Sequence, residues 1–598
     1  MLSRLTYAFS VIVLFVTSFI LHPTWDKEGD KATIVWDVAG YYWYLPTTFI
    51  YHDLKEQKFK DSLSNIYSAA DGMVAYKDTV TGHAVNKYSS GMAILYSPLF
   101  FAAHMVAPII GYPADGFSKP YQFAIQFGSL LISFLGLWYY RKFLLYYYSD
   151  TVTAIMLLLI VIGTNYLTYS ALNGAYTHNW LFTIYVLLLL ATKRFYEHPN
   201  IKHATYVGLL IGIAILVRPT EVVAFLIPML WGMENISLSS FKNRFQFFVN
   251  HYKHILVTIV CATLVFGIQI GYWLYVTGEP FVYSYQDQGF SFASPHTYNY
   301  MFSYKSGWLM YTPLLFFSFI GVIPFIRHGK NKVMILFFFA IFLYITSAWD
   351  IWWYAGTGGR AMIQSYPIIL IPFATLIEWL ASRKFIKWLA FTIILLFSYI
   401  NIWFTYSAHA KDGLYNPEAM TGAYYWHVIG RFKVPQYYER YMDTDEYFGG
   451  VPEDMKVIYT NDFEQDTTES REHVINGNVS MYFDKNREYG PVMTIPYNND
   501  DDADWIRAQI KTHPLNIEWT RWKMLSYIVY FKNTKENKTV KERSIKLNSI
   551  SKPFNTSDVY FDVKIPGEDF DRIEVLIWNP ASEVPIILDD IVLYSFKK

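Results

Sequence analysis

Long apolar segments recur along this chain up to about residue 406, and they restrict its fold more than any other feature. A helix that crosses a bilayer needs roughly 20 mainly apolar residues. About eleven segments meet or approach this length: 5–21, 121–140, 151–170, 179–192, 203–217, 220–233, 255–276, 307–326, 333–348, 362–380 and 388–406. They predict a polytopic α-helical membrane protein.

The composition agrees with a protein that lies in lipid. Charged residues make up 16% of the 598 residues and aromatic residues 19%, whereas about 25% is the usual charged share in soluble proteins. Trp and Tyr favour the membrane–water interfaces. The formal net charge is zero, so no general attraction to nucleic acid is indicated. The single cysteine, Cys261, excludes a disulfide framework and a cysteine-based metal site within one chain.

The charges of the loops predict an orientation, because Lys and Arg collect on the cytoplasmic side. We expect the first apolar segment to be retained as a helix with a cytoplasmic N-terminus, since no signal-peptide cleavage site follows it. Every loop then placed inside is basic: Arg141–Lys142, Lys193–Arg194, Lys242–Lys253, Arg327–Lys332 and Arg383–Lys387. The apolar segment 91–110 would invert this order as a span. We therefore assign it to a helix along the outer interface, with a true span as the alternative.

The domain organisation follows from a change in composition after residue 406. Residues 1–406 form the predicted membrane domain, with an outer loop at 22–120 that carries juxtamembrane helices. Residues 407–450 are a Tyr-rich connector. Residues 451–598 contain short alternating stretches separated by turn signals, which predict an all-β sandwich or jelly roll outside the cytoplasm.

Asp37 is the acid in an aromatic stretch, Trp36-Asp-Val-Ala-Gly-Tyr-Tyr-Trp-Tyr, that follows the first apolar segment closely. A charged group near the hydrocarbon edge costs free energy unless it is hydrated, paired or facing a cavity. Two interpretations remain open at this point. Asp37 caps a short helix at the interface, or it is a general base that accepts a proton from an attacking nucleophile.

Several motifs occur in a characteristic order along residues 1–406. They are Asp37 with Tyr41 and Tyr42, then Lys87-Tyr88 with Gly91 and Pro98, Arg141-Lys142, Arg218-Pro-Thr220, Trp308-Leu-Met-Tyr-Thr-Pro-Leu-Leu, and Trp349-Asp-Ile-Trp-Trp-Tyr-Ala-Gly-Thr-Gly-Gly-Arg360. In this order the chain resembles the GT-C glycosyltransferases, the class that includes protein O-mannosyltransferases and lipid A aminoarabinose transferases.

The resemblance implies an inverting transfer of a sugar from a polyprenyl-phosphate donor at the outer leaflet, with Asp37 as the base. The chain departs from the family in one respect, since Val38 and not a second acid follows Asp37. Asp30 and Asp53 therefore stay open as alternative bases.

The leaving lipid phosphate requires cations where negative charge develops. The candidates on the predicted outer side are Lys87, Arg218, Lys305 and Arg360. Arg360 follows a Gly-Thr-Gly-Gly turn that would let backbone N–H groups approach an anion. The alternatives are an interfacial ion pair of Arg360 with Asp350 and an ion pair of Arg218 with Glu221. Lys305 has the alternative of extending to the interface.

The residues expected to line the substrate site share a position in the outer loops. They are Tyr41, Tyr42, Tyr88, His178, His296, Asp350 and Trp353. No metal ligands are assigned from spacing, although a divalent metal in the active site stays open. In the C-terminal domain, Asp462-Phe-Glu464 and Asp589-Asp590 resemble acids that share a structural calcium ion in carbohydrate-binding jelly rolls, and oxygen-only ligation suits calcium.

The predicted function is therefore glycosylation in the cell envelope by an integral membrane transferase. Its partners would be a polyprenyl-phosphate sugar, a glycan, lipid or protein acceptor, and membrane lipids. We expect it in a bacterial inner membrane, with the C-terminal domain on the periplasmic or extracellular side. The alternative is a transporter or flippase for a lipid-linked saccharide. A transporter would place ionisable groups near the bilayer midplane, whereas here they gather towards one side.

Overall fold

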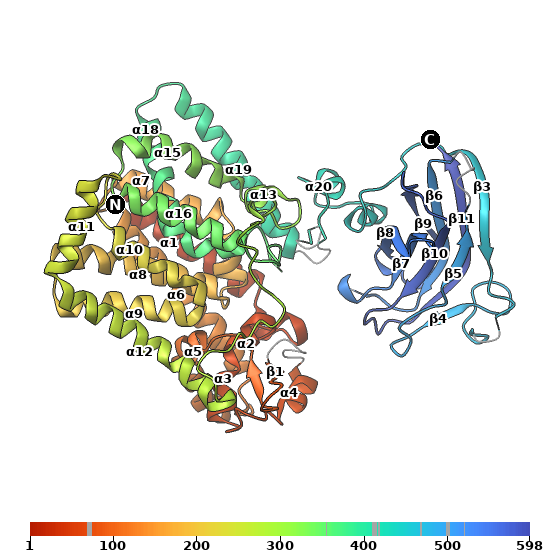
Figure 1. Cartoon of the computed structure of the whole chain (residues 1–598), viewed down its shortest axis with the longest axis horizontal. Coiled ribbons are helices and arrows are strands. Elements are labelled where there is room, and N and C mark those ends of the chain that lie inside the picture. Colours follow the sequence, from red (N-terminus) through yellow and green to blue (C-terminus); the bar gives the residue numbers. More distant parts are fainter. Residues whose placement is uncertain are drawn as a thin grey trace. The chain divides into compact units, whose positions relative to one another are not determined.

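The computed structural model describes residues 1–67, 75–354, 356–409, 415–416, 419–466, 469–497, 503–518 and 521–598. The chain divides into two compact units, Met1–Ala410 and Lys411–Lys598. The first is helical and the second consists mainly of strands (Figure 1). Parts of the predicted outer loop and connector, 68–74, 410–414 and 417–418, lie outside the described residues. The division at 406 and 450 stays a prediction.

Helices of the first unit mark the chain as an integral membrane protein. Five are long and apolar enough to cross a bilayer. They are α1 with its continuation (Leu2–Asp26), α5 (Gly91–Ile109), α6 (Lys119–Leu144), α12 (Tyr252–Thr277) and α19 (Ile386–His409). A sixth arises if Arg360–Ile369 and α18 (Ile371–Ala381), which meet at 52°, are one bent span. The prediction of about eleven spans is therefore not confirmed, since five or six segments qualify among the described residues.

The other predicted spans are helical but shorter or less apolar. The shorter ones are α7 (Asp150–Ile162), α9 (Ile201–Val217), Pro219–Leu230, Pro313–His328 and α16 (Lys332–Ser347). Two of them begin at a proline, which lacks the N–H that would continue the preceding helix. Helix α8 (Thr177–Glu197) has 21 residues but carries polar side chains at both ends. Helix α5 meets the same criteria as the spans, so its placement along the interface stays a prediction.

Helices α9 and α12 approach each other closely at two glycines. A Cβ atom on Gly208 would lie 2.4 Å from the carbonyl oxygen of Thr258, and one on Gly212 would lie 2.9 Å from the Cα atom of Ala262. Small residues four positions apart allow this kind of backbone contact between helices in membranes. The glycines of α9 therefore set its distance from α12.

The aromatic stretch around Asp37 forms two short helices, α2 (Trp36–Tyr42) and α3 (Tyr44–Phe49). Its tyrosines and tryptophan face a second apolar core beside the helices. Their polar atoms are satisfied inside this core: Trp43 Nε1 donates to Gln57 at 2.8 Å, and the Tyr44 hydroxyl donates to the carbonyl of Tyr88 at 2.6 Å. This packing fixes the position of α2 relative to the segment that precedes α5.

The second unit contains two antiparallel sheets. One has the order β5-β10-β7-β8, and the other has β3-β11-β6-β9 with β4 also paired to β11. The strands are β3 (Glu453–Asn461), β4 (Met481–Phe483), β5 (Met493–Pro496), β6 (Trp505–Pro514), β7 (Ser526–Asn533), β8 (Lys538–Lys546), β9 (Ser557–Lys564), β10 (Arg572–Trp578) and β11 (Ile586–Lys597). Strand β6 alternates buried and partly exposed side chains, and both sheets contribute to one apolar core. The predicted β domain is confirmed as two packed sheets.

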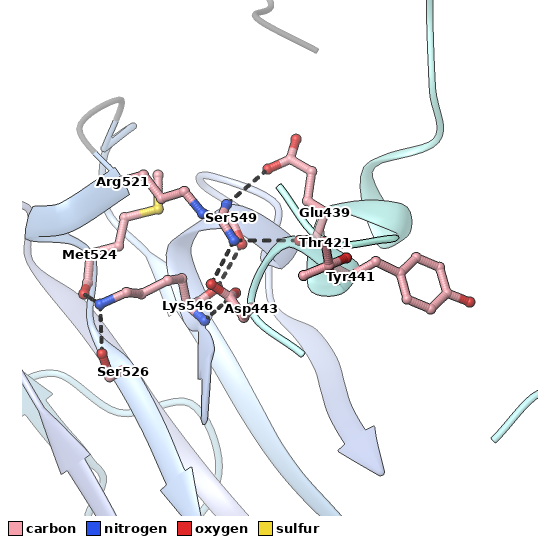
Figure 2. Close-up of polar contacts among 9 residues, drawn as sticks. All are labelled: Thr421, Glu439, Tyr441, Asp443, Arg521, Met524, Ser526, Lys546 and Ser549. Atoms are coloured by element: carbon pink, nitrogen blue, oxygen red, sulfur yellow. Dashed lines mark hydrogen bonds and ion pairs between the residues drawn. The ribbon is translucent and has the colours of Figure 1, made fainter. Parts of the chain in front are cut away.

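Residues 419–450 belong to this unit, and ion pairs and hydrogen bonds connect them to its other segments (Figure 2). Arg521 donates to Asp443 at 2.7 Å and lies 3.9 Å from the carboxylate of Glu439. The backbone N–H of Lys546 also donates to Asp443, at 2.8 Å. The predicted connector thus packs against the strands over this length.

Candidate active site

The structure brings Asp37, near the start of the sequence of the helical unit, into contact with Arg360, which lies near its end. Asp37 lies in the first turn of α2, and Arg360 begins η7 (Arg360–Ser365). The Nη2 atom of Arg360 donates to Oδ2 of Asp37 at 2.7 Å, while the Tyr88 hydroxyl donates to Oδ1 at 2.8 Å. The Asp37 side chain is 18% exposed. Each carboxylate oxygen therefore has one donor, and the group is partly accessible.

Arg360 is held between aromatic rings and keeps an unused donor. Its guanidinium lies 4.6 Å from the ring centre of Tyr354 and 5.1 Å from that of Tyr176. In the described part of the chain, its buried Nε atom and the buried Tyr354 hydroxyl have no hydrogen-bond partner. A buried polar group without a partner is costly, so these two atoms favour a polar ligand at this point.

The glycine turn before Arg360 allows a close approach to α14 (Trp308–Tyr311). Gly358 and Gly359 have φ values of +58° and +56°, and Cβ atoms there would lie 2.9 Å and 2.7 Å from the Cβ atoms of Tyr311 and Trp308. Only glycine adopts this conformation readily.

Two N–H groups of that turn already have acceptors in the protein. Thr357 N–H donates to the Tyr169 hydroxyl at 2.8 Å, and Gly359 N–H donates to the carbonyl of Ser306 at 3.0 Å. These two groups are therefore not available to an anion, and the expected role of the turn stays a prediction for its other N–H groups.

Arg218 is a second cation near this pair. It follows α9 directly, and its side chain is partly exposed. Within the described residues no acid lies within 4.0 Å of its guanidinium, Glu221 included, so the expected ion pair is not formed. Burial and Asp37 raise the pKa of the Tyr41 hydroxyl, and the charges of Arg218 and Arg360 lower it. All three charged groups thus act on one phenol.

Lys87 lies at the edge of the same group of residues. Its ammonium is 5.4 Å from the ring centre of Tyr285, and the rings of Tyr285 and Tyr88 are 6.1 Å apart. Burial, followed by the charge of Asp37, raises the pKa of the Tyr88 hydroxyl well above its usual value, which keeps Tyr88 a donor to Asp37.

A buried hydrogen-bond relay connects four side chains, those of His178, Gln364, Glu221 and Tyr185. His178 Nδ1 is 2.9 Å from Gln364 Oε1, and Gln364 Nε2 donates to Glu221 at 3.1 Å. The Tyr185 hydroxyl donates to the other Glu221 oxygen at 2.6 Å. Because Glu221 accepts the Gln364 amide, the Gln364 oxygen faces His178, which makes Nδ1 the protonated nitrogen of a neutral imidazole. The relay therefore fixes how His178 presents its other nitrogen.

Several expected site residues lie elsewhere or have other contacts. The Tyr42 hydroxyl is buried and donates to the carbonyl of Gly116 at 2.5 Å. Asp350 accepts from Gly289 N–H at 3.1 Å and from the Ser291 hydroxyl at 2.7 Å, so it is not the partner of Arg360. These contacts attach Asp350 to the loop that contains Gly289 and Ser291.

Lys305, Trp353 and His296 are not placed at the Asp37–Arg360 pair by any described contact. The Lys305 ammonium lies 4.1 Å from the ring centre of Trp353, which packs edge-on against Trp352. His296 begins α13 (Thr297–Phe302), and its N–H donates to the carbonyl of Ser347 at 2.8 Å.

The described residues do not provide a metal-ligand set. No group of three or more His, Cys, Asp or Glu side chains is gathered anywhere in the described ranges. In the second unit, Glu464 accepts from Asn478 N–H at 2.6 Å, Asp589 from the Ser480 hydroxyl at 2.6 Å, and Asp590 from Lys511 at 2.6 Å. These acids accept hydrogen bonds from protein donors, and the calcium site stays a prediction.

No family model matches the sequence, and no curated protein matches it. Solved structures that are similar to it include the following two. The Archaeoglobus fulgidus oligosaccharyltransferase has 12% identity and a TM-score of 0.39, over 68% of this chain and 54% of that chain. Arabinosyltransferase EmbB from Mycobacterium smegmatis has 9% identity and a TM-score of 0.28, over 83% of this chain and 59% of that chain. The chain thus spans little more than half the length of either structure, and similarity at this level leaves the activity to be argued from the site.

Sequence reasoning did not identify Tyr176 and Gln364 as parts of the site, and it favoured an interfacial position for Tyr354. Gln364 lies one turn after Arg360, and this spacing was the only signal for it in the sequence. The tyrosines stand among many interfacial aromatics, so their type alone did not distinguish them. Only the fold shows that two of these rings flank Arg360.

Proposed function

We propose that this protein is a membrane glycosyltransferase that transfers a sugar from a polyprenyl-phosphate donor to an acceptor hydroxyl or amine, with inversion and with Asp37 as general base. The observation that supports it most is the partly accessible Asp37 carboxylate, bonded to Arg360 and Tyr88, beside the unused Nε donor of Arg360. A base and an anion-binding group next to each other suit a transfer that removes a proton and releases a phosphate.

In this proposal the acceptor gives its proton to Asp37 as its oxygen or nitrogen attacks the anomeric carbon. The bond from that carbon to the acceptor forms while the bond to the phosphate oxygen breaks. The polyprenyl phosphate leaves with the bonding electron pair, and its negative charge grows beside Arg360 and Arg218. Attack from the side opposite the leaving group inverts the anomeric centre.

The ion pair between Asp37 and Arg360 has a place in this scheme. A donor phosphate would compete with Asp37 for the Arg360 guanidinium, because arginine binds phosphate with two parallel hydrogen bonds. Partial transfer of Arg360 to the phosphate would release Oδ2 of Asp37 for the acceptor proton. Tyr88 would still hold the other carboxylate oxygen.

An apolar groove between α5 and α6 suits the hydrocarbon chain of such a donor. It has a volume of about 540 Å³, and its walls include Leu99 and Val106 of α5 and Phe123 and Phe127 of α6. Helix α5 begins at Gly91, three residues after Tyr88. The same helix therefore leads from the Asp37 contact to the groove.

Replacement of Asp37 by Asn tests the proposal. Full-length protein would be reconstituted with lipid-linked sugars extracted from membranes, and released polyprenyl phosphate would be measured by mass spectrometry. We expect turnover to fall by about 100-fold or more, because general-base catalysis typically contributes that much. Asp30→Asn is compared with it because Asp30 is an alternative base; Asp30 is exposed, so we expect near wild-type turnover, and a loss in this variant instead would make Asp30 the base.

Equal turnover of wild type and Asp37→Asn would remove Asp37 from the mechanism. Movement of the intact lipid-linked saccharide across the bilayer, without release of polyprenyl phosphate, would instead identify a transporter.

A further inference from the structure

Helix α11 (Leu238–Asn250) lies at the edge of the helical unit and has no fully buried residue (Figure 1). It follows the tight turn after Trp231 and precedes α12. Nothing in the proposed function depends on it. Its sequence, Leu-Ser-Ser-Phe-Lys-Asn-Arg-Phe-Gln-Phe-Phe-Val-Asn, is amphipathic.

One face packs on the protein. The Phe247 ring stacks on Tyr196 of α8, with 4.7 Å between ring centres and 19° between the planes. Arg244 donates to the carbonyl of Trp231, and its guanidinium lies 4.7 Å from the ring centre of Tyr196. These contacts fix the rotation of α11 about its own axis.

A second face is apolar and has no partner in the described chain. Its residues recur every three or four positions and are strongly exposed: Leu238 (87%), Phe241 (46%), Phe245 (69%), Val249 (49%) and Tyr252 (61%). On α11 this spacing places Leu238, Phe241, Phe245 and Val249 in one stripe, and Tyr252 follows as the first residue of α12. At about 100° per residue, the stripe is turned roughly 160° away from Phe247.

The chain fixes where this stripe lies. Only His251 separates α11 from α12, which is long and apolar enough to span the membrane. The start of α12 therefore brings α11 to the membrane surface. Helix α8 reaches the active site with His178 in its first turn and contacts α11 near its last turn. Helix α11 is thus at the membrane face opposite Asp37.

The charge of α11 suits an anionic surface. The helix contains Lys242 and Arg244 and no acidic residue, and Lys253 follows in α12. Lys242 and Lys253 are exposed. An in-plane helix with an apolar stripe and flanking lysines binds the boundary between lipid headgroups and acyl chains, more strongly when the lipids are anionic.

We propose that α11 lies in the membrane plane at the face opposite the active site, with the stripe from Leu238 to Val249 inserted among anionic phospholipids. The stripe supplies apolar burial, and Lys242 and Lys253 contact the headgroup phosphates. The lipid surface, and not a second copy or a soluble protein, is the occupant because the adjoining span places the stripe beside lipid.

Site-directed fluorescence on the full chain tests this. In a Cys261→Ala background, Phe245→Cys and Asn243→Cys each carry an environment-sensitive fluorophore. Both positions are exposed, and they point to opposite sides of the helix, about 200° apart. In vesicles of phosphatidylethanolamine and phosphatidylglycerol we expect the label at 245 to shift to the blue and to be quenched by brominated lipid. The label at 243 should be quenched by aqueous iodide.

Two results would overturn the proposal. Quenching of both labels by iodide would show that the stripe faces water. Protection of the label at 245 from both quenchers would show that a protein surface covers it.

The preference for anionic lipid has its own test. Lipid quenching at 245 should weaken in phosphatidylcholine vesicles, and in the Lys242→Glu/Lys253→Glu variant. Quenching that is the same in both lipids would refute the contribution of these lysines.

Discussion

At the scale of single residues, the small number of protein partners that Arg360 and Arg218 have favours an anionic ligand. Asp37 uses both carboxylate oxygens, whereas Arg360 retains one unpaired donor and no acid lies within ion-pair distance of Arg218 in the described chain. Buried cations are normally paired. Two cations with spare capacity beside one acid are therefore a better indication of an anionic ligand than any one of them alone.

Arg360→Lys is expected to lower the transfer rate by about 10-fold or more, either through kcat or through a higher donor KM. A lysine supplies one point charge and cannot bond Asp37 and a phosphate together with a planar fork. Steady-state kinetics with the lipid-linked donor measure this. Lys305→Ala is the comparison, because Lys305 lies over Trp353. Equal kinetics of wild type and Arg360→Lys would show that the fork of Arg360 is not used.

Glu221→Gln is expected to destabilise the fold by about 1–3 kcal/mol, the cost of leaving a buried donor unpaired. Gln364 and Tyr185 donate to different oxygens of Glu221, and a glutamine offers only one acceptor oxygen. Thermal unfolding in detergent measures the effect. Tyr185→Phe should cost a similar amount, because it leaves one oxygen of the buried Glu221 carboxylate without a donor. No loss in either variant would contradict the relay.

At the scale of elements, close helix contacts position the site. Helix α9 ends at Val217, and Arg218 follows it directly. The packing of α9 on α12 therefore decides where Arg218 stands. Glycine is required at this contact because any side chain would meet the backbone of α12.

Gly208→Ala is expected to lower the free energy of unfolding by about 1–3 kcal/mol, as overpacking does. Its Cβ atom would lie 2.4 Å from the Thr258 carbonyl oxygen. Gly267→Ala in α12 is the matched control, since a Cβ atom there meets nothing within 4 Å. That control should gain about 0.5–1 kcal/mol from reduced backbone freedom. Thermal unfolding midpoints compare the two, and equal shifts would argue against the helix contact.

At the scale of the whole molecule, the chain consists of a helical membrane unit and a β unit that includes residues 419–450. The attachment of this segment to the sheets depends on pH. Burial raises the pKa of Glu439 to about 7, and Arg521 opposes that rise while Asp443 adds to it. This raised pKa applies to Glu439 in the docked state. Docked Glu439 therefore keeps its proton up to about pH 7, whereas Glu439 in the released segment loses it from about pH 4.5 upward.

Docking of this segment should therefore weaken as the pH rises from about 4.5 to about 7 and stay constant above that range. Hydrogen exchange of the backbone amides in η8 (Gln436–Met442) on the full chain measures it. Glu439→Gln, which cannot ionise, should remove the dependence over this range. An unchanged dependence in that variant would assign it to another group.

The sequence by itself determined the classes of structure: apolar helices up to about residue 406, β strands after 450, and Asp37 and Arg360 as notable charges. Composition and periodicity carry this information because they act locally. The number of spans is not confirmed, since apolar length does not show where proline or polar residues end a helix. Only the tertiary structure decided that Arg360 pairs with Asp37 and not with Asp350, and that Gln364 connects His178 to Glu221. These contacts join residues up to 323 positions apart, and such distant partners are chosen by the packing of the whole helical unit.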